Sequence, residues 1–161
     1  MINQQKKQLG GQLVGKAHVE ELVSNYKKQR WIHNTNRLGK EDSLSAWFNL
    51  EALEGFLELA REQHADGIKI FFGVYPENFE KKPEYSGRQT LVLVATKEKA
   101  DPEGGVVNKE IYVQRDGQPE ILAFNYSNIC PPSCGSGLPG SGNEFEIGIS
   151  IFENNNRVVV V

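Results

Sequence analysis

The sequence predicts an α+β domain in which two N-terminal helices pack on one face of a mainly antiparallel sheet of about six strands. Apolar residues recur at helical spacing in two segments before residue 65. Short runs rich in β-branched and aromatic residues follow, and turn-forming residues separate them. The 161 residues are enough for one domain with a single hydrophobic core.

The N-terminal part is predicted to be an arm followed by a helix. Residues 1–15 are polar and interrupted by glycine, so we expect a flexible arm, with residues 16–161 forming the single domain. An amphipathic helix is predicted from Lys16 to about Arg30, because apolar residues recur at Val19, Leu22, Val23 and Tyr26. The polar run at residues 33–36 predicts a break, and residues 39–45 a connection to the second helix.

The second helix is predicted to begin at an Asn49 N-cap, whose side-chain oxygen can accept from a free N–H of the first turn. Phe48 and Leu53 have the spacing of a hydrophobic staple around that cap. Asp66-Gly67 is predicted to end the helix. The apolar stripe predicted to be buried consists of Leu50, Leu53, Phe56, Leu57 and Ala60.

Two strands are predicted after the helix. In the strand from Ile68 to Tyr75, the adjacent Phe71 and Phe72 point to opposite faces, so we expect both faces to be covered at least in part. Residues 90–95 are apolar on both faces, which is typical of a strand in the middle of a sheet. Residues 76–87 form the loop between these two strands.

Two hairpins are predicted in the second half of the chain. Asp116-Gly117 lies between β-prone runs at residues 110–114 and 121–124, which favours a tight turn. Residues 145–152 alternate between apolar and polar, residues 154–156 are three asparagines, and four valines end the chain. We expect Val158 to Val161 to pair within the sheet or across a homodimer interface, because exposed valine strands aggregate.

Three segments resemble a group of small bacterial proteins, chiefly from Bacteroidetes, to which no activity is assigned. They are W-F-N-L-E-x-L from Trp47, D-G-I-K-I-F-F-G-V-Y from Asp66, and R-Q-T-L-V-L-V-A-T from Arg88. These segments hold core and cap residues from about the middle half of the chain. The resemblance implies a fold and a bacterial, intracellular origin, and it implies no catalytic residues.

Composition argues against nucleic acid and membrane partners. Lysine and arginine number 18 against 21 aspartate and glutamate residues, so the basic surface that a phosphate backbone requires is missing. No stretch has the length and apolarity of a membrane span, and residues 1–15 lack the apolar core of a secretion signal. We therefore expect a cytoplasmic location, in which cysteines are ordinarily reduced.

Cys130 and Cys134 flank Pro131-Pro132-Ser133 in a loop rich in proline and glycine, residues 130–142. Their spacing is compatible with two thiolates on one zinc ion, although a structural zinc site needs four ligands. A disulfide requires close Cα atoms and an oxidising environment. Free thiols, a zinc site and a disulfide therefore all stay open, with free thiols expected first and no cofactor expected otherwise.

Aromatic residues at strand ends could line a ligand site where the loop from Tyr75 to Arg88 meets the loop at residues 130–142. The candidate ligand-binding residues are Tyr75, Tyr85, Arg88 and Tyr126. No triad of serine, histidine and carboxylate has a defensible spacing, so the leading hypothesis is a non-enzymatic module that binds an unknown protein or small polar ligand. The alternatives are a metal-dependent or thiol-dependent enzyme using Cys130 and Cys134, and a structural component that dimerises through its C-terminal strand.

Overall fold

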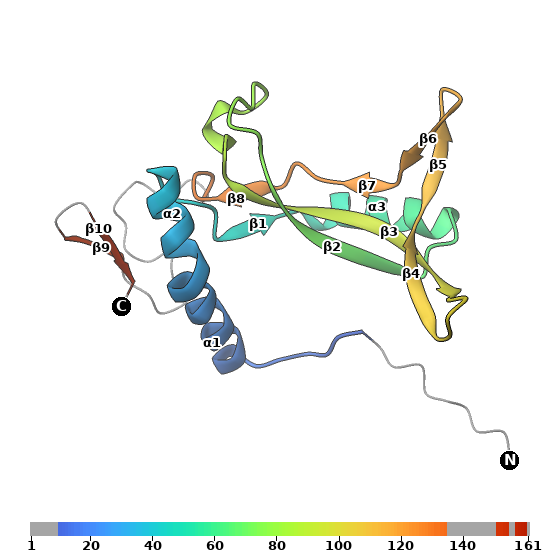
Figure 1. Cartoon of the computed structure of the whole chain (residues 1–161), viewed down its shortest axis with the longest axis horizontal. Helices are drawn as coiled ribbons and strands as arrows, with labels where there is room; N and C mark the ends of the chain where they lie inside the picture. Colours follow the sequence, from blue (N-terminus) through green and yellow to red (C-terminus); the bar gives the residue numbers. More distant parts are fainter. Residues whose placement is uncertain (1–9, 135–150, 155–156, 161) are drawn as a thin grey trace, which may run out of the picture.

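The computed structural model describes residues 10–134 and the backbone of residues 151–154 and 157–160. Its main sheet has the order β2 (Gly67–Val74), β3 (Gln89–Ala100) and β4 (Val106–Glu110), and β7 (Ala123–Phe124) also pairs with β3. All of its ladders are antiparallel, and helices flank the sheet (Figure 1). The predicted α+β class is confirmed. The main sheet has four strands instead of about six, because the other described strands form separate pairs.

The first helix is longer than the sequence predicted. It runs through α1 (Lys16–Tyr26), a π-helical segment (Lys27–Trp31) and α2 (Ile32–Leu38). The predicted break at residues 33–36 is wrong, because Thr35 is buried and its Oγ1 accepts from the backbone N–H of Asp42 (3.1 Å). Such tertiary contacts outweigh the low helix propensity of this polar run. The helix ends at Gly39, which takes the left-handed conformation (φ 70°).

Both ends of the second helix, α3 (Leu50–Glu62), are fixed by local contacts after the short strand β1 (Ser45–Trp47). Asn49 is the N-cap as predicted, since its Oδ1 accepts from the N–H of Ala52 (2.7 Å). The predicted end at Asp66-Gly67 is wrong. His64 takes the left-handed conformation (φ 61°), and the next N–H, of Ala65, donates back to the Ala60 carbonyl (2.9 Å).

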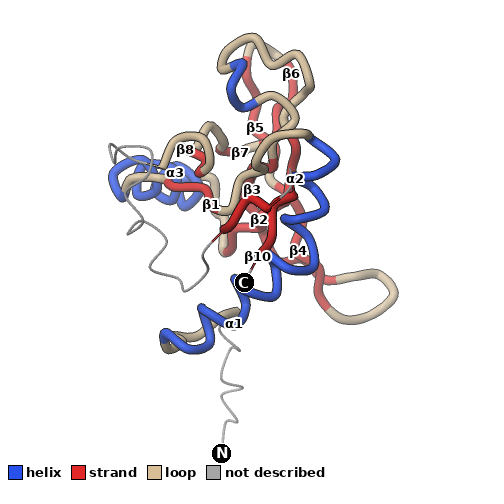
Figure 2. The backbone as a smooth tube through the Cα atoms, turned by 90° about the vertical axis from the view of Figure 1, so that its left-hand side faces the viewer, coloured by secondary structure: helices blue, strands red, loops and turns tan. Residues whose placement is uncertain are grey.

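The main core lies between α3 and one face of the sheet. Figure 2 shows the backbone of these elements in a view turned by 90°. Phe56 is buried and stacks on Phe124, with ring centroids 5.1 Å apart. Phe48 and Leu53 pack against the same core, at the positions of the predicted staple. Leu50 departs from the predicted stripe, because its side chain is 74% exposed. The buried residues of this core are Phe56, Ala60, Leu93, Ala95 and Leu122.

The central strand and its following hairpin agree with the sequence. β3 lies between β2 on one side and β4 and β7 on the other, as expected for a strand that is apolar on both faces. β5 (Tyr112–Arg115) and β6 (Gln118–Ile121) form the predicted hairpin. Asp116 and Gly117 both have positive φ, at 48° and 77°, which is the requirement of this turn type.

The chain ends in a hairpin of β9 (Ile151–Asn154) and β10 (Arg157–Val160), in which Asn154 lies opposite Arg157. This terminal hairpin was predicted. Among the described strands, β10 pairs with β9 alone, and it lies beside α2 instead of joining the main sheet. Residues 145–150 of the predicted strand lie outside the described residues, and the homodimer through Val158 to Val161 stays a prediction.

We expect Asn49→Ala to lower the free energy of unfolding by about 1 kcal/mol, because the Ala52 N–H loses its acceptor. Urea titration followed by circular dichroism measures the change. Asn36→Ala is the matched control, since Asn36 is an exposed asparagine inside α2 and alanine is a better helix former. An equal loss in both variants would contradict a capping role.

Candidate functional site

The outer edge of β2 is unpaired in the part of the chain that the structure describes. β3 pairs with the inner side of β2, and no described strand pairs with its outer side. Ile68 lies opposite Ala95, whose N–H donates to the Leu122 carbonyl (3.0 Å) and not to β2. Backbone groups alternate between the two sides of an antiparallel strand. The residues that direct their N–H and C=O outward are therefore Ile68, Ile70, Phe72 and Val74.

The side chains of these four residues share one face of the sheet, because they alternate along the strand. Ile68 packs against the α3 core, whereas Ile70 is 55%, Val74 62% and Phe72 81% exposed. Phe71 projects from the opposite face, where the Lys69 ammonium lies 5.6 Å from its ring centroid. The expected partial cover of both faces is uneven: Ile68 packs against the α3 core on one face, and Phe71 is 42% exposed on the other. β2 is an edge strand of the main sheet and not a central one.

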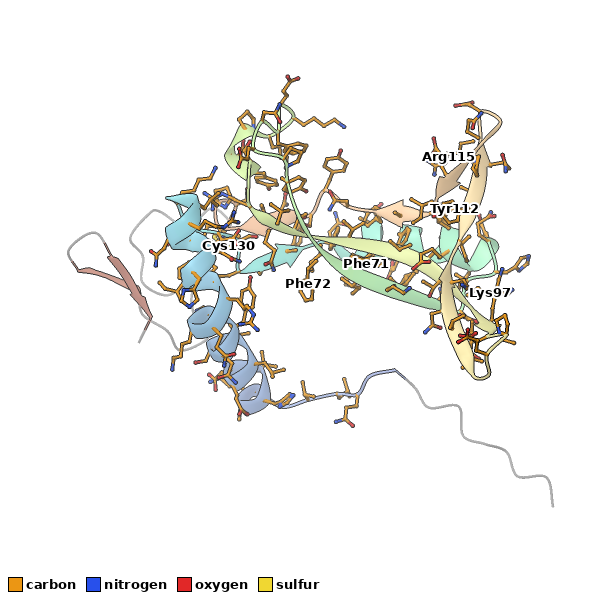
Figure 3. All side chains as sticks on the ribbon, in the orientation of Figure 1. Phe71, Phe72, Lys97, Tyr112, Arg115 and Cys130 are labelled. Carbon is orange, nitrogen blue, oxygen red and sulfur yellow. A yellow bond between two sulfur atoms is a disulfide. The ribbon has the colours of Figure 1, made fainter. Side chains whose placement is uncertain are left out.

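A pocket of about 240 Å³ lies next to Phe72, between α1 and the sheet. In Figure 3 the Phe72 ring projects from β2 toward the side on which α1 lies. Leu22 and Val23 of α1 form one wall, and Phe72 and Leu91 form the opposite wall. None of the described residues that line it is charged. The remaining lining residues are Tyr26, Ser43, Leu44, Ser45, Ala46, Gln89 and Thr90.

Hydrogen bonds fix the polar wall of this pocket. The Asp42 carboxylate accepts from the N–H of Ser43 (2.8 Å) and of Gln89 (2.7 Å), and the Ser43 hydroxyl donates to the Gln89 carbonyl. Tyr26 donates its hydroxyl hydrogen to Gln89 Oε1 (2.8 Å). Burial, and then the negative charge of Asp42, raise the pKa of Tyr26, so its hydroxyl stays a donor at neutral pH.

A buried tryptophan anchors the same wall to the long helix. Trp31 has no exposed surface, and its Nε1–H donates to the Asp42 carbonyl (2.7 Å). The segment that follows Asp42 is therefore held from the helix side and from the sheet side. We name the outer edge of β2 together with this pocket the β2 groove.

Two of the ligand-binding candidates, Tyr75 and Tyr85, are buried and pack within the protein. Both rings contact each other (centroids 5.7 Å apart), and they pack with Ile129 in a second hydrophobic cluster. The Tyr75 hydroxyl donates to Asn125 Oδ1 (3.1 Å), and the Tyr85 hydroxyl lies 3.0 Å from the hydroxyl of Ser133. The loop after Tyr75 thus meets the segment at residues 130–134, as the sequence predicted, but it forms core there.

The other two candidates differ in accessibility. Tyr126 is 56% exposed with positive φ (67°), and the Lys81 ammonium lies 4.8 Å from its ring centroid. Arg88 is buried, and its Nε donates to the Glu84 carbonyl (2.9 Å), while its Nη1 has no hydrogen-bond partner among the described residues. Burial lowers the pKa of Arg88, against the opposing effect of the acidic residues Asp42 and Glu41. Tyr126 is the accessible member of the predicted set.

Cys130 and Cys134 are joined by a disulfide, with Cα atoms 4.7 Å apart. Of the three alternatives left open by the sequence, the disulfide is therefore the one present, and free thiols are not. A disulfide sulfur lacks the thiolate that zinc requires, so the zinc prediction applies to the reduced form alone. Within residues 10–134, no group of three or more histidine, cysteine, aspartate or glutamate side chains is placed to hold a metal ion.

Comparison with protein-family models, with curated proteins and with solved structures finds no match for this chain. Among the described residues, none of the helices is long and apolar enough to cross a membrane. Function therefore has to be inferred from the geometry of the chain itself.

The sequence did not predict the β2 groove, although it contained a partial signal. Phe71 and Phe72 were recognised as residues of opposite faces, which holds in any strand. Their exposure depends on β2 lying at the edge of the sheet, and strand order is not encoded within the strand. Leu22 and Val23 were predicted as part of the apolar side of an amphipathic helix, and in the structure they line the pocket beside Phe72.

Proposed function

We propose that this protein is a non-enzymatic binding module that accepts an extended segment of a partner protein as an additional strand on the outer edge of β2. The observation that carries the proposal is the open edge itself: its outward backbone groups and its exposed apolar side chains belong to the same residues. Backbone hydrogen bonds would supply affinity, and the pocket beside Phe72 would select one side chain of the partner.

The lining of the pocket favours a particular partner chemistry. Because its described lining has no charged side chain, an ionised group of the partner would lose its hydration without gaining an opposite charge. An uncharged apolar side chain in an alternating segment fits both the pocket and the exposed stripe of Ile70, Phe72 and Val74. This chemistry favours a protein segment over the small polar ligand that was also considered.

The same lining argues for binding over catalysis. Its polar groups are hydroxyls and one amide, and Tyr26, whose pKa is raised, is the titratable group among them. General acid and base catalysis needs groups that change protonation near the working pH. We also propose a cytoplasmic location. Disulfides in that compartment are usually transient, so alkylation of cell lysates should find Cys130 and Cys134 at least partly as free thiols, and a fully oxidised pair would contradict this location.

We expect a fluorescein-labelled, capped peptide of sequence Lys-Thr-Ile-Thr-Phe-Thr-Ile-Thr-Lys to bind the full chain, as measured by fluorescence anisotropy. Phe72→Thr should weaken its binding about ten-fold or more, because an apolar anchor at the centre of the groove is lost. Threonine keeps the β propensity of the strand.

Phe71→Thr is the matched control, since this neighbour has the same side chain on the opposite face. Its affinity for the peptide should stay within about two-fold of the unmodified chain. Two N-methylated versions of the peptide add a second control. One carries methyl groups on the backbone nitrogens of the threonines, and the other carries them on those of the apolar residues. Because alternate N–H groups point to opposite sides of a strand, one version loses the N–H groups that bond to β2 and the other keeps them. Equal losses for Phe71→Thr and Phe72→Thr, or for both peptides, would rule out strand addition at this edge.

A further inference from the structure

The disulfide between Cys130 and Cys134 lies at the wall of a surface pocket. Cys130 and Cys134 are partly exposed and line a pocket of about 440 Å³. Trp47, whose side chain is 59% exposed, forms part of the same pocket. The rest of the lining is uncharged and polar, from Ser45, Asn128 and Ser133. We therefore expect a thiol reagent to approach the disulfide through this pocket without unfolding of the chain.

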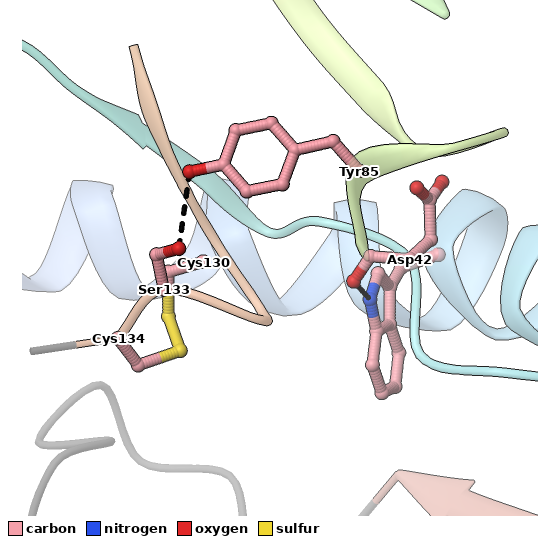
Figure 4. Close-up of a disulfide and its surroundings, with 6 residues drawn as sticks. Asp42, Tyr85, Cys130, Ser133 and Cys134 are labelled. Carbon is pink, nitrogen blue, oxygen red and sulfur yellow. Dashed lines mark hydrogen bonds between the residues drawn. A yellow bond between two sulfur atoms is a disulfide. The ribbon is translucent and has the colours of Figure 1, made fainter. Parts of the chain in front are cut away.

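The bond spans a short loop, and this limits its value as a structural staple. Three residues separate the two cysteines, and the entropy that a crosslink removes from the unfolded chain is smallest for short loops. The neighbouring Ser133 is held by other contacts, so we expect reduction to loosen the two cysteines without unfolding this segment. The N–H of Ser133 donates to the Ile129 carbonyl (2.9 Å), and its hydroxyl contacts that of Tyr85 (Figure 4).

The disulfide is linked to the β2 groove through one short strand. Cys130 ends β8 (Asn128–Cys130), which pairs with β1 so that Cys130 lies opposite Ser45. The Cys130 carbonyl also accepts from the N–H of Leu44 (2.6 Å). Leu44 and Ser45 both line the pocket beside Phe72, and Ser45 lines the pocket beside the disulfide as well. A movement of Cys130 would therefore act on the groove wall through the hydrogen bond between the Leu44 N–H and the Cys130 carbonyl.

We propose that the bond between Cys130 and Cys134 is a thiol–disulfide exchange site for a dithiol reductant, and that its reduction loosens the wall of the β2 groove. A thiolate of the reductant attacks one sulfur, which forms a mixed disulfide and releases the other cysteine as a thiolate. The second thiol of the reductant then attacks the mixed disulfide. Two electrons and two protons reach the protein as two thiols, and the reductant leaves as a disulfide.

The proposal is tested first without any ligand, on the full chain with dithiothreitol as the reductant. The rate of thiol release should rise linearly with dithiothreitol concentration under native conditions, because the bond is accessible in the folded state. A rate that levels off at the rate of unfolding would overturn the proposed site. Hydrogen exchange of the Leu44 and Ala46 amides should become faster on reduction, and unchanged exchange would overturn the link to the groove.

Binding of the peptide probe gives the second test, and this arm rests on the proposed function. Affinity should fall about five-fold or more on reduction, which is the scale of a typical coupling between sites. The double variant Cys130→Ser with Cys134→Ser should bind weakly with and without dithiothreitol. Equal affinity of the oxidised and reduced chains would overturn the control of the groove and leave the proposed function intact. No binding in either state would refute the proposed function, and hydrogen exchange would still decide the redox link.

Discussion

Asp42→Ala is expected to lower the free energy of unfolding by about 3 kcal/mol or more. The Asp42 side chain is buried, and its Oδ1 accepts from two backbone N–H groups, of Ser43 and Gln89. Alanine would leave both donors buried without an acceptor, and each such loss costs about 1–3 kcal/mol. The guanidinium of Arg88, which the charge of Asp42 favours, would also lose a neighbouring negative charge.

Two further variants separate the causes of this loss. Asp42→Asn keeps an oxygen acceptor but removes the charge, so we expect a loss between those of the unmodified chain and Asp42→Ala. Glu41→Ala removes an adjacent, exposed carboxylate and should change stability by less than about 0.5 kcal/mol. Urea titration of the three variants measures the differences. A loss in Asp42→Ala no larger than that in Glu41→Ala would contradict the role given to this side chain.

Phe56→Ala should cost about 3–5 kcal/mol, because it opens a cavity between α3 and the sheet. Phe56 is 4% exposed, and its ring stacks on Phe124 at the centre of the main core. The effect is large enough to unfold a domain of marginal stability, so Phe56→Leu, which leaves a smaller void, provides a measurable intermediate.

Leu50→Ala is the matched control on the same helix. Both residues belong to the apolar stripe predicted from helical spacing, yet Leu50 is 74% exposed. We expect Leu50→Ala to change stability by about 0.5 kcal/mol or less. Thermal unfolding followed by circular dichroism compares the two variants directly. Similar losses at Leu50 and Phe56 would mean that α3 buries the whole stripe, and that its placement on the sheet is incorrect.

Features set by neighbouring residues could be predicted from the sequence. The Asn49 cap depends on a side chain three positions before its donor, and the turn at Asp116 and Gly117 depends on two residues that accept positive φ. The alternation of Ile68, Ile70 and Phe72 likewise follows from the period of a strand. Each of these is a local rule, and the structure follows each of them.

Features set by distant contacts could not be predicted in this way. The helix continues through residues 33–36 because Thr35 meets Asp42, and no local pattern reports that contact. Tyr75 and Tyr85 were expected at a ligand site and instead fill a small core with Ile129. The β2 groove could not be predicted either, because the exposure of Phe72 depends on which strand lies at the edge of the sheet, and distant contacts set that order.

The outer edge of β2, which is unpaired among the described strands, also has a consequence for the solubility of this protein. Natural edge strands are commonly shielded by outward lysines, by proline or by bulges. The lysine of this strand, Lys69, forms an ion pair with Glu110 instead of shielding the edge. Copies of the chain whose β2 edge is unfilled would associate edge to edge, so we expect solubility to fall as the concentration of the chain rises. Overexpression of the chain by itself is the condition in which that dependence becomes visible.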